Sequence, residues 1–507
     1  MIPDLKQKLK AYMEDFNRLD EELYPQAVPN SDAYAFLAGQ VPLLECPDRQ
    51  LEETYYFRWW TFRKHLKETP YGHIVTEFLP SVKWAGSFNS INCSACFHIR
   101  EGRWLADPDG WMKEYIAFWL DRRGDAMSYS AWLASAVEEY CTLRGDETFG
   151  ASCLDALIDL YHRWEEKALQ SSGLFWSDDN RDGMEFSISG PGSRPTLNSY
   201  MYGDAMAIAR MARSVGRVAV AEAFEQKACD LKERIQRLLW DGDFFKGIPC
   251  AKGAQISTEQ RPKIPPDHDV RELVGYIPWY FNLPDQGYEA GFAHLRDECG
   301  FQAPFGLTTA ERRHPRFMFE NPHECLWNGP VWPFATSQTL VAAANLLRNY
   351  HQNTLTKEDY FEMLHQYATS HRRVEAAGQT LHWIDENMHP FTGEWLARSI
   401  LEKRGWLPDA GGYERGKDYN HSLFCDLVLS GLLGIGPDGS GNLTASPLIP
   451  ETWDFFCVSG VWFRGQAYVV LYDRTGERYG EGQGLITKKL SGTVNNLSKN
   501  GKPSGSR

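Results

Sequence analysis

Apolar residues recur at helical spacing along most of this chain, from about residue 105 to about residue 435. Typical segments are GWMKEYIAFWLDRRG, SCLDALIDLYHRWEEKAL and SQTLVAAANLLRNY. Several such segments end in glycine, and the loops between them are rich in Gly, Pro, Trp and Asp. The pattern predicts a mainly helical protein in which long polar and aromatic loops alternate with helices.

The order of the predicted helices bears on how they pack. Paired helices with few convincing strands favour an α/α toroid, in which helix pairs close into a barrel and the loops at one end build a site. A solenoid is the alternative, but the sequence shows no repeat of fixed period. We therefore expect an all-α-dominated toroid.

The pattern changes near residue 437. The segment FFCVSGVWFRGQAYVVLYDRTGERYGEG alternates between apolar and polar residues and places DRTG as a turn between strand-like runs. The final SGTVNNLSKNGKPSGSR has almost no apolar content. We expect a helical extension and lead-in over residues 1–50, a barrel domain over 51–436, a small β-rich appendage over 437–495 and a disordered tail over 496–507.

Charge and hydropathy restrict the classes of partner. The net charge of −14 argues against nucleic acid, whose phosphates require a basic surface. No apolar run approaches the roughly 20 residues of a membrane span, and the charged amino terminus lacks the apolar core of a secretory signal. We expect a soluble cytoplasmic protein that contacts neither nucleic acid nor membrane.

Cysteine usage points to reduced thiols and not to a metal site. The eleven cysteines are scattered, which suits buried thiols better than a disulfide framework. Cys93 and Cys96 have CxxC spacing, but no second pair completes a zinc site. No loop with calcium-ligand spacing is evident either, so we expect no metal and no cofactor.

Aromatic content is the unusual feature of the composition. The chain holds 18 Trp, 23 Tyr and 27 Phe, and many stand beside Asn, Asp, Gly or Arg instead of inside apolar runs. Flat rings beside hydrogen-bonding groups match the C–H faces and hydroxyl edges of a sugar. We expect a carbohydrate substrate, although core packing is the competing explanation for any single ring.

Three loops combine aromatic residues and glycines, and two of them carry clustered carboxylates. Cleavage of a glycosidic bond requires one carboxyl group that protonates the leaving oxygen and a second that activates water or attacks directly. Crowding and partial burial would raise the pKa of at least one member of such a cluster. Helix capping and binding of loop amides are the alternative roles. The candidates are Asp178, Asp179, Asp182 and Glu185 in one loop, and Asp385, Glu386 and Glu394 in another.

Two of these loops carry motifs of a known enzyme group. WNGPVWP (residues 327–333) resembles the W-x-G-P-[VI]-W segment of glycoside hydrolase family 63 and its mannosylglycerate hydrolase-like relatives, and ENMHPFTGE (residues 386–394) resembles their E-x-Y-x-P-x-T-G segment. GMEFS (residues 183–187) is a weaker match to the G-x-D-N-S-like segment that holds their general acid. Glu185 stands where those relatives have Asp, so either Glu185 or its neighbour Asp182 is the expected proton donor.

The resemblance implies an (α/α)6 barrel and hydrolysis with inversion of anomeric configuration. By position, Glu386 would be the base that acts on water. An inverting mechanism places a water between the base and the anomeric carbon, so the two carboxyl groups should lie about 6.5 to 9.5 Å apart. Residues 51–436 would then form the catalytic domain.

Further residues are expected to line a sugar-binding cleft because they combine aromatic or polar side chains with loop or helix-start positions. In the loop WNGPVWP (residues 327–333), called the tryptophan loop below, the rings would stack on sugar while Gly329 and Pro330 fix the backbone path. Helix packing, or capping by residues such as Asn420 beside Tyr419, is the alternative. The candidates are Tyr56, Arg58, Trp59, Trp60, Trp84, Asn89, Arg194, Asn198, Tyr200, Tyr202, Trp327, Asn328, Trp332, Trp383, His389, Glu394 and His421.

The favoured hypothesis is an inverting, exo-acting glycosidase for a short oligosaccharide or small glycoside, of glucosidase, mannosidase or β-L-arabinofuranosidase type. A sugar epimerase or isomerase is the second hypothesis, since that chemistry also occurs on helical toroids and uses paired bases. A catalytically inactive sugar-binding protein is the third. The histidines that the second hypothesis would draw on are His98, His323, His382, His389 and His421.

Overall fold

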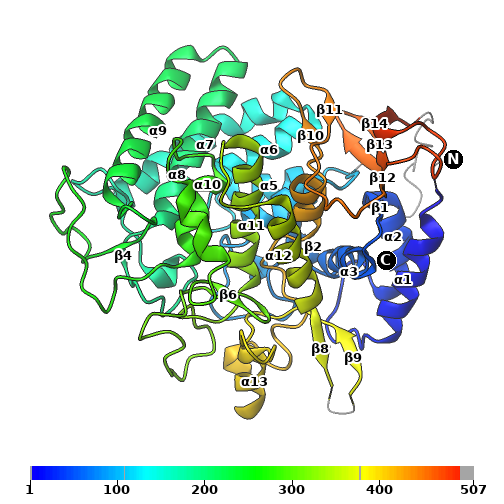
Figure 1. Ribbon diagram of the computed structural model, residues 1–507, viewed down its shortest axis with the longest axis horizontal. Helices are drawn as coiled ribbons and strands as arrows, with labels where there is room; N and C mark the ends of the chain where they lie inside the picture. Colours follow the sequence, from blue (N-terminus) through cyan, green and yellow to red (C-terminus); the bar gives the residue numbers. More distant parts are fainter. Residues whose placement is uncertain (1–2, 108, 376–377, 491–507) are drawn as a thin grey trace, which may run out of the picture.

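Helices dominate the computed structural model, which describes residues 3–107, 109–375 and 378–490 (Figure 1). The tail expected over residues 496–507 lies outside the described residues. Within them, no helix is both long and apolar enough to cross a bilayer. The α-helices are α1 (Lys6–Arg18), α2 (Ala33–Gln40), α3 (Arg49–Lys64), α4 (Ala95–Gly102), α5 (Trp111–Leu120), α6 (Leu133–Arg144), α7 (Glu147–Ala168), α8 (Pro195–Ser214), α9 (Val218–Leu238), α10 (Ile277–Tyr280), α11 (Pro333–Asn349), α12 (Lys357–Ser370) and α13 (Leu396–Lys403).

Local sequence signals begin many of these helices. The side chain of Asp48 caps α3, and that of Asp146 caps α7. A reciprocal capping box between Thr356 and Asp359 begins α12. Helices α8 and α11 begin with proline at the first helical position, where the missing N–H costs nothing.

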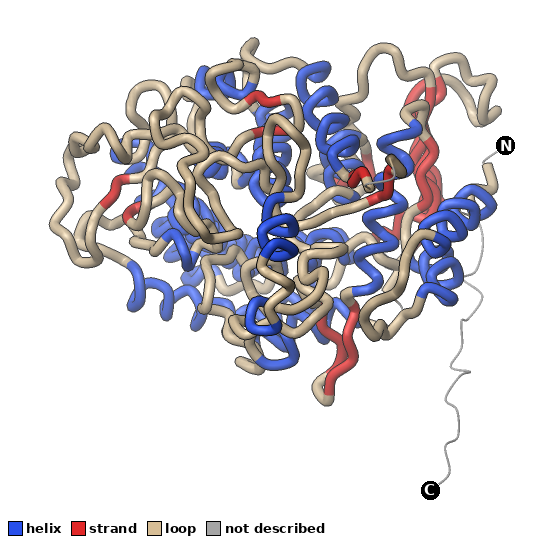
Figure 2. The backbone as a smooth tube through the Cα atoms, turned by 90° about the horizontal axis from the view of Figure 1, so that it is seen from below, coloured by secondary structure: helices blue, strands red, loops and turns tan. Residues whose placement is uncertain are grey.

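The burial of the helices separates an inner from an outer layer. Helices α3, α8 and α11 are buried on nearly every face, whereas α7 and α9 bury a single stripe and expose the rest. An α/α toroid has this arrangement, and the expected fold class is confirmed. Seen from below, long loops cover the middle of the molecule between the helices (Figure 2).

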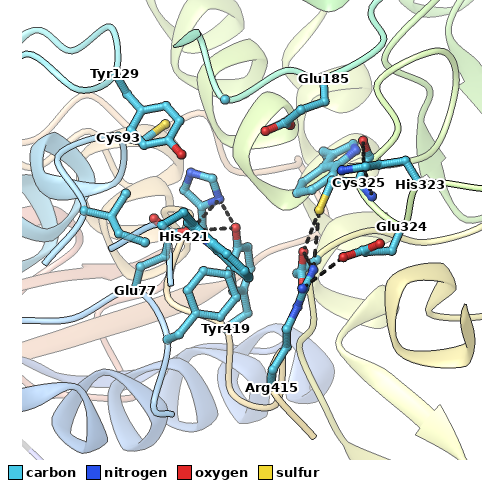
Figure 3. A pocket seen from close by; sticks show the side chains of 16 residues that line it. Glu77, Cys93, Tyr129, Glu185, His323, Glu324, Cys325, Arg415, Tyr419 and His421 are labelled. Atoms are coloured by element: carbon cyan, nitrogen blue, oxygen red, sulfur yellow. Dashed lines mark hydrogen bonds and ion pairs between the residues drawn. The ribbon is translucent and has the colours of Figure 1, made fainter. Parts of the chain in front are cut away.

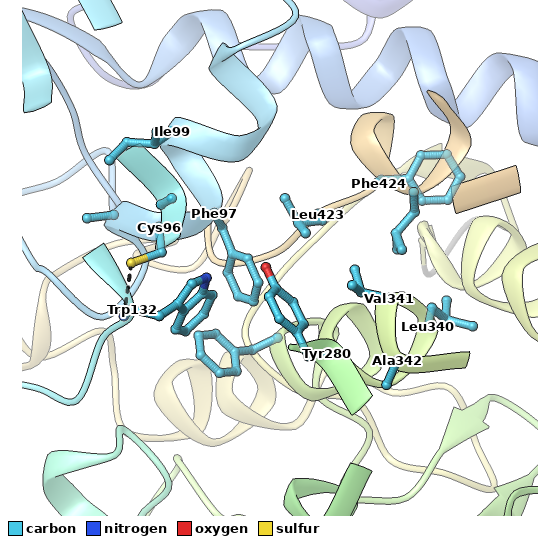
Figure 4. Close-up of a cluster of buried hydrophobic side chains, with 14 of the residues drawn as sticks. Cys96, Phe97, Ile99, Trp132, Tyr280, Leu340, Val341, Ala342, Leu423 and Phe424 are labelled. Atoms are coloured by element: carbon cyan, nitrogen blue, oxygen red, sulfur yellow. Dashed lines mark hydrogen bonds between the residues drawn. The ribbon is translucent and has the colours of Figure 1, made fainter. Parts of the chain in front are cut away.

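The core of the toroid is aromatic where inner helices meet. Phe97 of α4 lies 5.1 Å from Trp132 and 4.7 Å from Phe334 of α11, measured between ring centroids. Small residues of α11, such as Ala342, let the neighbouring helices approach closely (Figure 4). The apolar run after the tryptophan loop thus belongs to the inner wall, as the sequence pattern indicates.

Two predicted helices differ from regular α-helix. The segment GYEAGFAHLRDECG forms the 3-10 helix η5 (Glu289–Leu295), where the hydroxyl of Tyr276 donates to the Gly291 carbonyl at 2.9 Å in place of a helical amide. The segment around DLVLSGLLG forms the π-helix η7 (Leu427–Leu432), and Arg348 binds the carbonyls of Ser430 and Gly431. Side chains therefore take backbone acceptors that an α-helix would use.

A four-stranded antiparallel sheet forms the β-rich part, in the order β1-β12-β13-β14. Alternate residues of β12 face opposite ways, so Val458 joins the main core while Cys457 joins a smaller cluster on the far side. DRTG lies between β13 and β14, as predicted. The sheet also takes β1 from the amino-terminal segment. Its strands are β1 (Leu43–Glu45), β12 (Phe455–Phe463), β13 (Gln466–Asp473) and β14 (Gly484–Lys489).

The remaining strands are short pairs within loops. The pair β2 and β3 precedes the loop that contains Glu77, and the pair β8 and β9 precedes the loop that contains Glu386. The pairs are β2 (Leu66–Thr69) with β3 (Gly72–Val75), β4 (Gly192–Ser193) with β5 (Ile248–Pro249), β6 (Gln302–Ala303) with β7 (Gly306–Leu307), β8 (Arg372–Val374) with β9 (Thr380–His382), and β10 (Gly436–Pro437) with β11 (Leu443–Thr444).

Candidate active site

Loops from six parts of the chain enclose a cavity of about 200 Å³ (Figure 3). They follow β3, join α5 to α6, follow the 3-10 helix η3 (Asp179–Arg181), precede α11, follow β9 and precede η7. Four glutamates and one arginine are among the described residues that line it. The lining residues are Glu77, Phe78, Trp84, Ile91, Cys93, Tyr129, Gly183, Glu185, His323, Glu324, Cys325, Trp332, Glu386, Arg415, Tyr419 and His421.

Glu185 presents to the cavity a carboxyl group that has no side-chain partner among the described residues. Its backbone carbonyl accepts from the Trp327 amide at 3.0 Å, which ties its loop to the tryptophan loop. The neighbouring Phe186 has a left-handed backbone with φ of 60°, so the chain turns sharply at this point. Burial raises the pKa of Glu185 to about 7, and the negative charge of Glu386 contributes. Near neutral pH, this carboxyl can hold a proton.

Glu386 has the opposite environment. Its side chain is about 1% exposed, and its two oxygens accept from Nε and Nη2 of Arg415 at 2.8 and 3.1 Å. The thiol of Cys325 donates to Oε2 of Glu386 at 3.1 Å. Two hydrogen bonds from one guanidinium orient a carboxylate and compensate its charge. Glu386 is therefore a fixed anion at the cavity wall.

Arg415 joins two of the cavity glutamates. Besides Glu386, it donates through Nη1 to Glu324 at 3.0 Å, and its guanidinium lies 5.0 Å from the ring centroid of Trp84. Burial lowers its pKa, but the neighbouring anions, Glu386 first, raise it well above the usual value for arginine. The cation is thus fully used by carboxylates within the protein.

A third carboxyl group, Glu77, lies at the opposite wall. It accepts from the Tyr419 hydroxyl at 2.9 Å and from the Ser94 hydroxyl at 3.1 Å. Burial raises the pKa of Glu77 to about 8. Tyr419 also contacts Nδ1 of His421, whose pKa burial lowers well below the usual histidine value. Sequence reasoning missed Glu77, because it stands alone in VTEFLP without a second carboxylate or a motif.

Five of the residues expected in the site line this cavity: Glu185, Glu386, Trp84, Trp332 and His421. Trp327 stacks behind Trp332, with ring centroids 4.5 Å apart and an interplanar angle of 15°. Only the Trp332 ring of this pair lines the cavity, and its Nε1 donates to the Leu326 carbonyl at 2.7 Å. Asn328 is fully buried and donates to the Phe319 carbonyl at 2.8 Å. The tryptophan loop therefore supports one wall through a stacked pair.

Asp182 lies outside the cavity, which corrects the expectation that it could donate the proton. Its Oδ2 accepts from Nε of Arg194 at 2.7 Å, and both side chains are about 1% exposed or less. Ser130 donates to its Oδ1 at 2.7 Å, and Thr196 contacts Oδ2. A buried carboxylate with these partners stabilises the loop, and Arg194 serves the same ion pair instead of a ligand.

Several further expected residues are buried in the inner helices or bind backbone groups, and they lie outside the cavity. On α3, buried all round, Tyr56 contacts the backbone of Leu44 and Arg58 donates to the Ser422 carbonyl at 3.1 Å. Polar-aromatic composition there reflects the inner wall, where polar groups find backbone partners. Asn89 binds the Phe78 and Pro80 carbonyls, and Asn198 binds the Phe175 carbonyl. Trp59 is fully buried on α3, and Tyr200 and Tyr202 are buried on α8.

The other expected residues lie at two further cavities or in a turn. Trp60 and Trp383 line a space of about 30 Å³ beside α3, enough for about one water molecule. Glu394 lines a separate pocket of about 410 Å³ between the β8–β9 hairpin and α13. His389 accepts backbone amides of residues 391 and 392. These side chains are ordered by local structure.

Sequence reasoning also missed Tyr129, Cys325 and Arg415. Arg415 follows a glutamate in GGYERG, a pattern typical of a surface ion pair. Its position twelve residues before η7 gave no sign that it reaches Glu386. Among the described residues, no group of three or more His, Cys, Asp or Glu side chains is arranged to hold a metal ion.

Comparison with known proteins gives one family match and clear structural neighbours. Residues 87–422 match the mannosylglycerate hydrolase MGH1-like glycoside hydrolase domain. A solved structure described as a sialidase is 38% identical, with a TM-score of 0.85 over 96% of this chain and 43% of that one. A Streptomyces avermitilis α-L-rhamnosidase complexed with L-rhamnose is 13% identical, with a TM-score of 0.51 over 86% of this chain and 36% of that one. The chain thus spans less than half the length of either protein.

Proposed function

Because the chain belongs to the family of mannosylglycerate hydrolase MGH1-like glycoside hydrolase domains, we propose that its cavity hydrolyses the glycosidic bond of a terminal neutral sugar, with inversion of anomeric configuration. The observation that carries the proposal is the contrast between two carboxyl groups at one cavity. Glu185 has no side-chain partner and a pKa raised to about 7, whereas Glu386 is paired with Arg415. Such a contrast identifies a proton donor and an anionic partner.

In the proposed reaction, the carboxyl of Glu185 donates its proton to the glycosidic oxygen as the bond to the anomeric carbon breaks. The carboxylate of Glu386 accepts a proton from a water that attacks the anomeric carbon from the opposite face. Each turnover leaves Glu185 ionised and Glu386 protonated, and exchange with solvent restores both. Inversion requires the expected separation of about 6.5 to 9.5 Å between the two carboxyl groups.

The size of the cavity supports action at a chain end. About 200 Å³ equals the liquid volume of roughly seven water molecules, which suits one sugar ring and not a run of them. Trp84, which is 40% exposed, and Phe186, which is 37% exposed, present aromatic surface close to the cavity glutamates. The leaving part of the substrate would extend past these rings, so we propose an exo-acting enzyme.

The charge of the cavity favours a neutral sugar over an acidic one. A sialidase acts on a sugar that carries a carboxylate, and one similar structure bears that description. Here Arg415 is the lining arginine, and it is already paired with Glu386 and Glu324. An additional sugar carboxylate would face the carboxylates of Glu386 and Glu324, and no other arginine or lysine is among the described residues that line the cavity. Glucosidase, mannosidase and β-L-arabinofuranosidase activities are the types we propose to test.

The experiment is a screen of the purified protein against nitrophenyl glycosides, natural disaccharides and a sialoside, followed by NMR detection of the product anomer. Hydrolysis of a neutral glycoside, first release of the inverted anomer and loss of activity in both Glu185→Gln and Glu386→Gln are expected. First release of the retained anomer would contradict the inverting mechanism and indicate a retaining one. Cleavage of the sialoside alone would overturn the neutral-sugar assignment. If the wild-type protein cleaves no substrate of the panel, the proposed hydrolytic activity is overturned.

A further inference from the structure

We propose that Glu77, Tyr419 and His421 form a proton relay that decides whether Nε2 of His421 donates or accepts a hydrogen bond toward a sugar hydroxyl in the cavity. The relay itself is a property of the free protein. Its contact with a sugar hydroxyl rests on the function proposed above.

The relay consists of three side chains in direct contact. The Tyr419 hydroxyl lies 2.9 Å from Oε1 of Glu77 and also contacts Nδ1 of His421. Ser94 donates to the other oxygen of Glu77 at 3.1 Å. Figure 3 shows the His421 ring at the cavity wall beside Tyr419. Every polar atom of the relay except one therefore has a partner within the protein.

The exception is Nε2 of His421. This atom is buried and has no hydrogen-bond partner among the described residues, although His421 lines the cavity and is only 4% exposed. A buried polar atom without a partner carries a free-energy cost that a ligand hydroxyl would remove. The position therefore fits a group that binds the substrate.

Proton counting links the free end of the relay to Glu77. With Glu77 ionised, Tyr419 donates to Glu77, Nδ1–H of His421 donates to the Tyr419 oxygen, and Nε2 carries a lone pair. With Glu77 protonated, Glu77 donates to the Tyr419 oxygen, Tyr419 donates to Nδ1, and Nε2 carries the hydrogen. The second state holds one more proton than the first. Each proton in the relay shifts by one hydrogen bond. Tyr419 and His421 stay neutral in both states, and only Glu77 changes its charge.

The surroundings favour the protonated state at neutral pH. Burial first, with contributions from Glu386 and Glu185, raises the pKa of Glu77 to about 8 although the hydrogen bonds from Tyr419 and Ser94 lower it. His98, which faces His421, is itself kept neutral, because burial lowers its pKa to about 3. The other titratable groups that face the relay are the buried thiols and phenols of Cys93, Cys325, Tyr115 and Tyr129, whose pKa values burial raises. Nε2 is then a donor below about pH 8 and an acceptor above it.

The tautomer of His421 can be observed without a substrate. Protein labelled with ¹⁵N-histidine gives spectra that distinguish protonated from unprotonated ring nitrogens, and His421→Gln assigns the His421 signals among the 14 histidines. Between about pH 6 and about pH 9.5, the wild type should change from Nε2–H to Nδ1–H with a midpoint near 8. A single tautomer across this range would overturn the relay.

Three variants locate the switch. Tyr419→Phe removes the central hydroxyl and Glu77→Gln removes the titrating group, so in each the pH-dependent change of tautomer should vanish. Tyr129→Phe is the matched control, because Tyr129 lines the cavity but forms no hydrogen bond with the relay, and the change should persist. An undiminished switch in Tyr419→Phe or in Glu77→Gln would overturn the proposal.

The sugar contact is tested with the nitrophenyl glycoside that the wild type cleaves and with its singly deoxygenated analogues. Removal of one ring hydroxyl should lower kcat/KM about tenfold or more in the wild type and should have no further effect in His421→Phe. Equal penalties in both proteins would overturn the contact. If no glycoside is cleaved but the tautomer switch is present, the proposed function fails while the relay stands.

Discussion

Nε of Arg415 lies 2.8 Å from Oε1 of Glu386, and each of the two side chains is about 1% exposed. A buried ion pair of this kind contributes little relative to an apolar pair, but the loss of one partner leaves a buried charge uncompensated. Arg415 also binds Glu324, so its loss would expose two carboxylates to each other. The wall that holds the proposed base therefore depends on one cation from a distant loop.

Replacement of Arg415 should destabilise the protein and abolish hydrolysis. We expect Arg415→Met to lower the free energy of unfolding by about 3–5 kcal/mol, because Glu386 would remain buried without its counter-ion. Arg404→Met is the matched control: Arg404 also pairs with Glu324 but is 37% exposed, so its loss should cost less than about 1 kcal/mol. Urea denaturation measures both, and equal losses would contradict the assigned difference in burial.

The pH dependence of kcat/KM should follow the protonated form of Glu185. A general acid acts only while it holds its proton, so activity is present below its pKa and is lost as pH rises through it. Since burial raises that pKa to about 7, kcat/KM should fall about tenfold per pH unit above pH 7. Initial rates in buffers of constant ionic strength measure the profile. A flat profile to about pH 9 would exclude Glu185 as the donor.

Glu185→Gln should discriminate between leaving groups. A natural disaccharide needs protonation of its leaving oxygen, so we expect kcat/KM to fall by roughly 10² to 10⁴. A dinitrophenyl glycoside has a leaving group that departs without a proton. The fall in kcat/KM for this substrate should therefore be much smaller. Glu386→Gln is the comparison, because loss of the base should slow both substrates alike. Equal losses for both substrates in Glu185→Gln would assign that residue another role.

The helical fold could be predicted from the sequence because helix periodicity is a local property. The apolar spacing of α7, α9 and α11, the Asp146 cap of α7 and the proline at the start of α11 all lie within or next to the segments themselves. The two departures, η5 and η7, are accompanied by contacts from side chains outside the segments themselves. Tyr276 and Arg348 bind carbonyls in those segments, and no local pattern indicates such contacts.

Among the cavity carboxyl groups, only the two that a motif accompanied could be predicted. Glu185 and Glu386 stand in segments with recognisable neighbours, and the structure brings both to one cavity. Polar-aromatic composition was a poorer guide, because α3 has the same composition in the buried inner wall. Glu77 and Arg415 meet the site through tertiary contacts alone, so their roles depend on the fold of loops that are separated by more than 300 residues.

Asp182 provides the sharpest test of the assignment of the proton donor, because it lies three residues before Glu185 and was the first alternative to it. The ion pair with Arg194 and the hydrogen bond from Ser130 make it a buried structural anion. Asp182→Asn should therefore lower the free energy of unfolding by about 3–5 kcal/mol.

The same variant should leave catalysis almost intact. At a temperature where Asp182→Asn remains folded, kcat should stay within a few-fold of the wild type, because Glu185 still donates the proton. Asp178→Asn is the matched control in the same loop: Asp178 caps η3 near the surface, so its loss should cost about 1 kcal/mol. Thermal unfolding and kcat measured on the same samples separate the two effects. A hundredfold loss of kcat with unchanged stability would transfer the role of proton donor to Asp182, because only a group that takes part in the reaction would then respond.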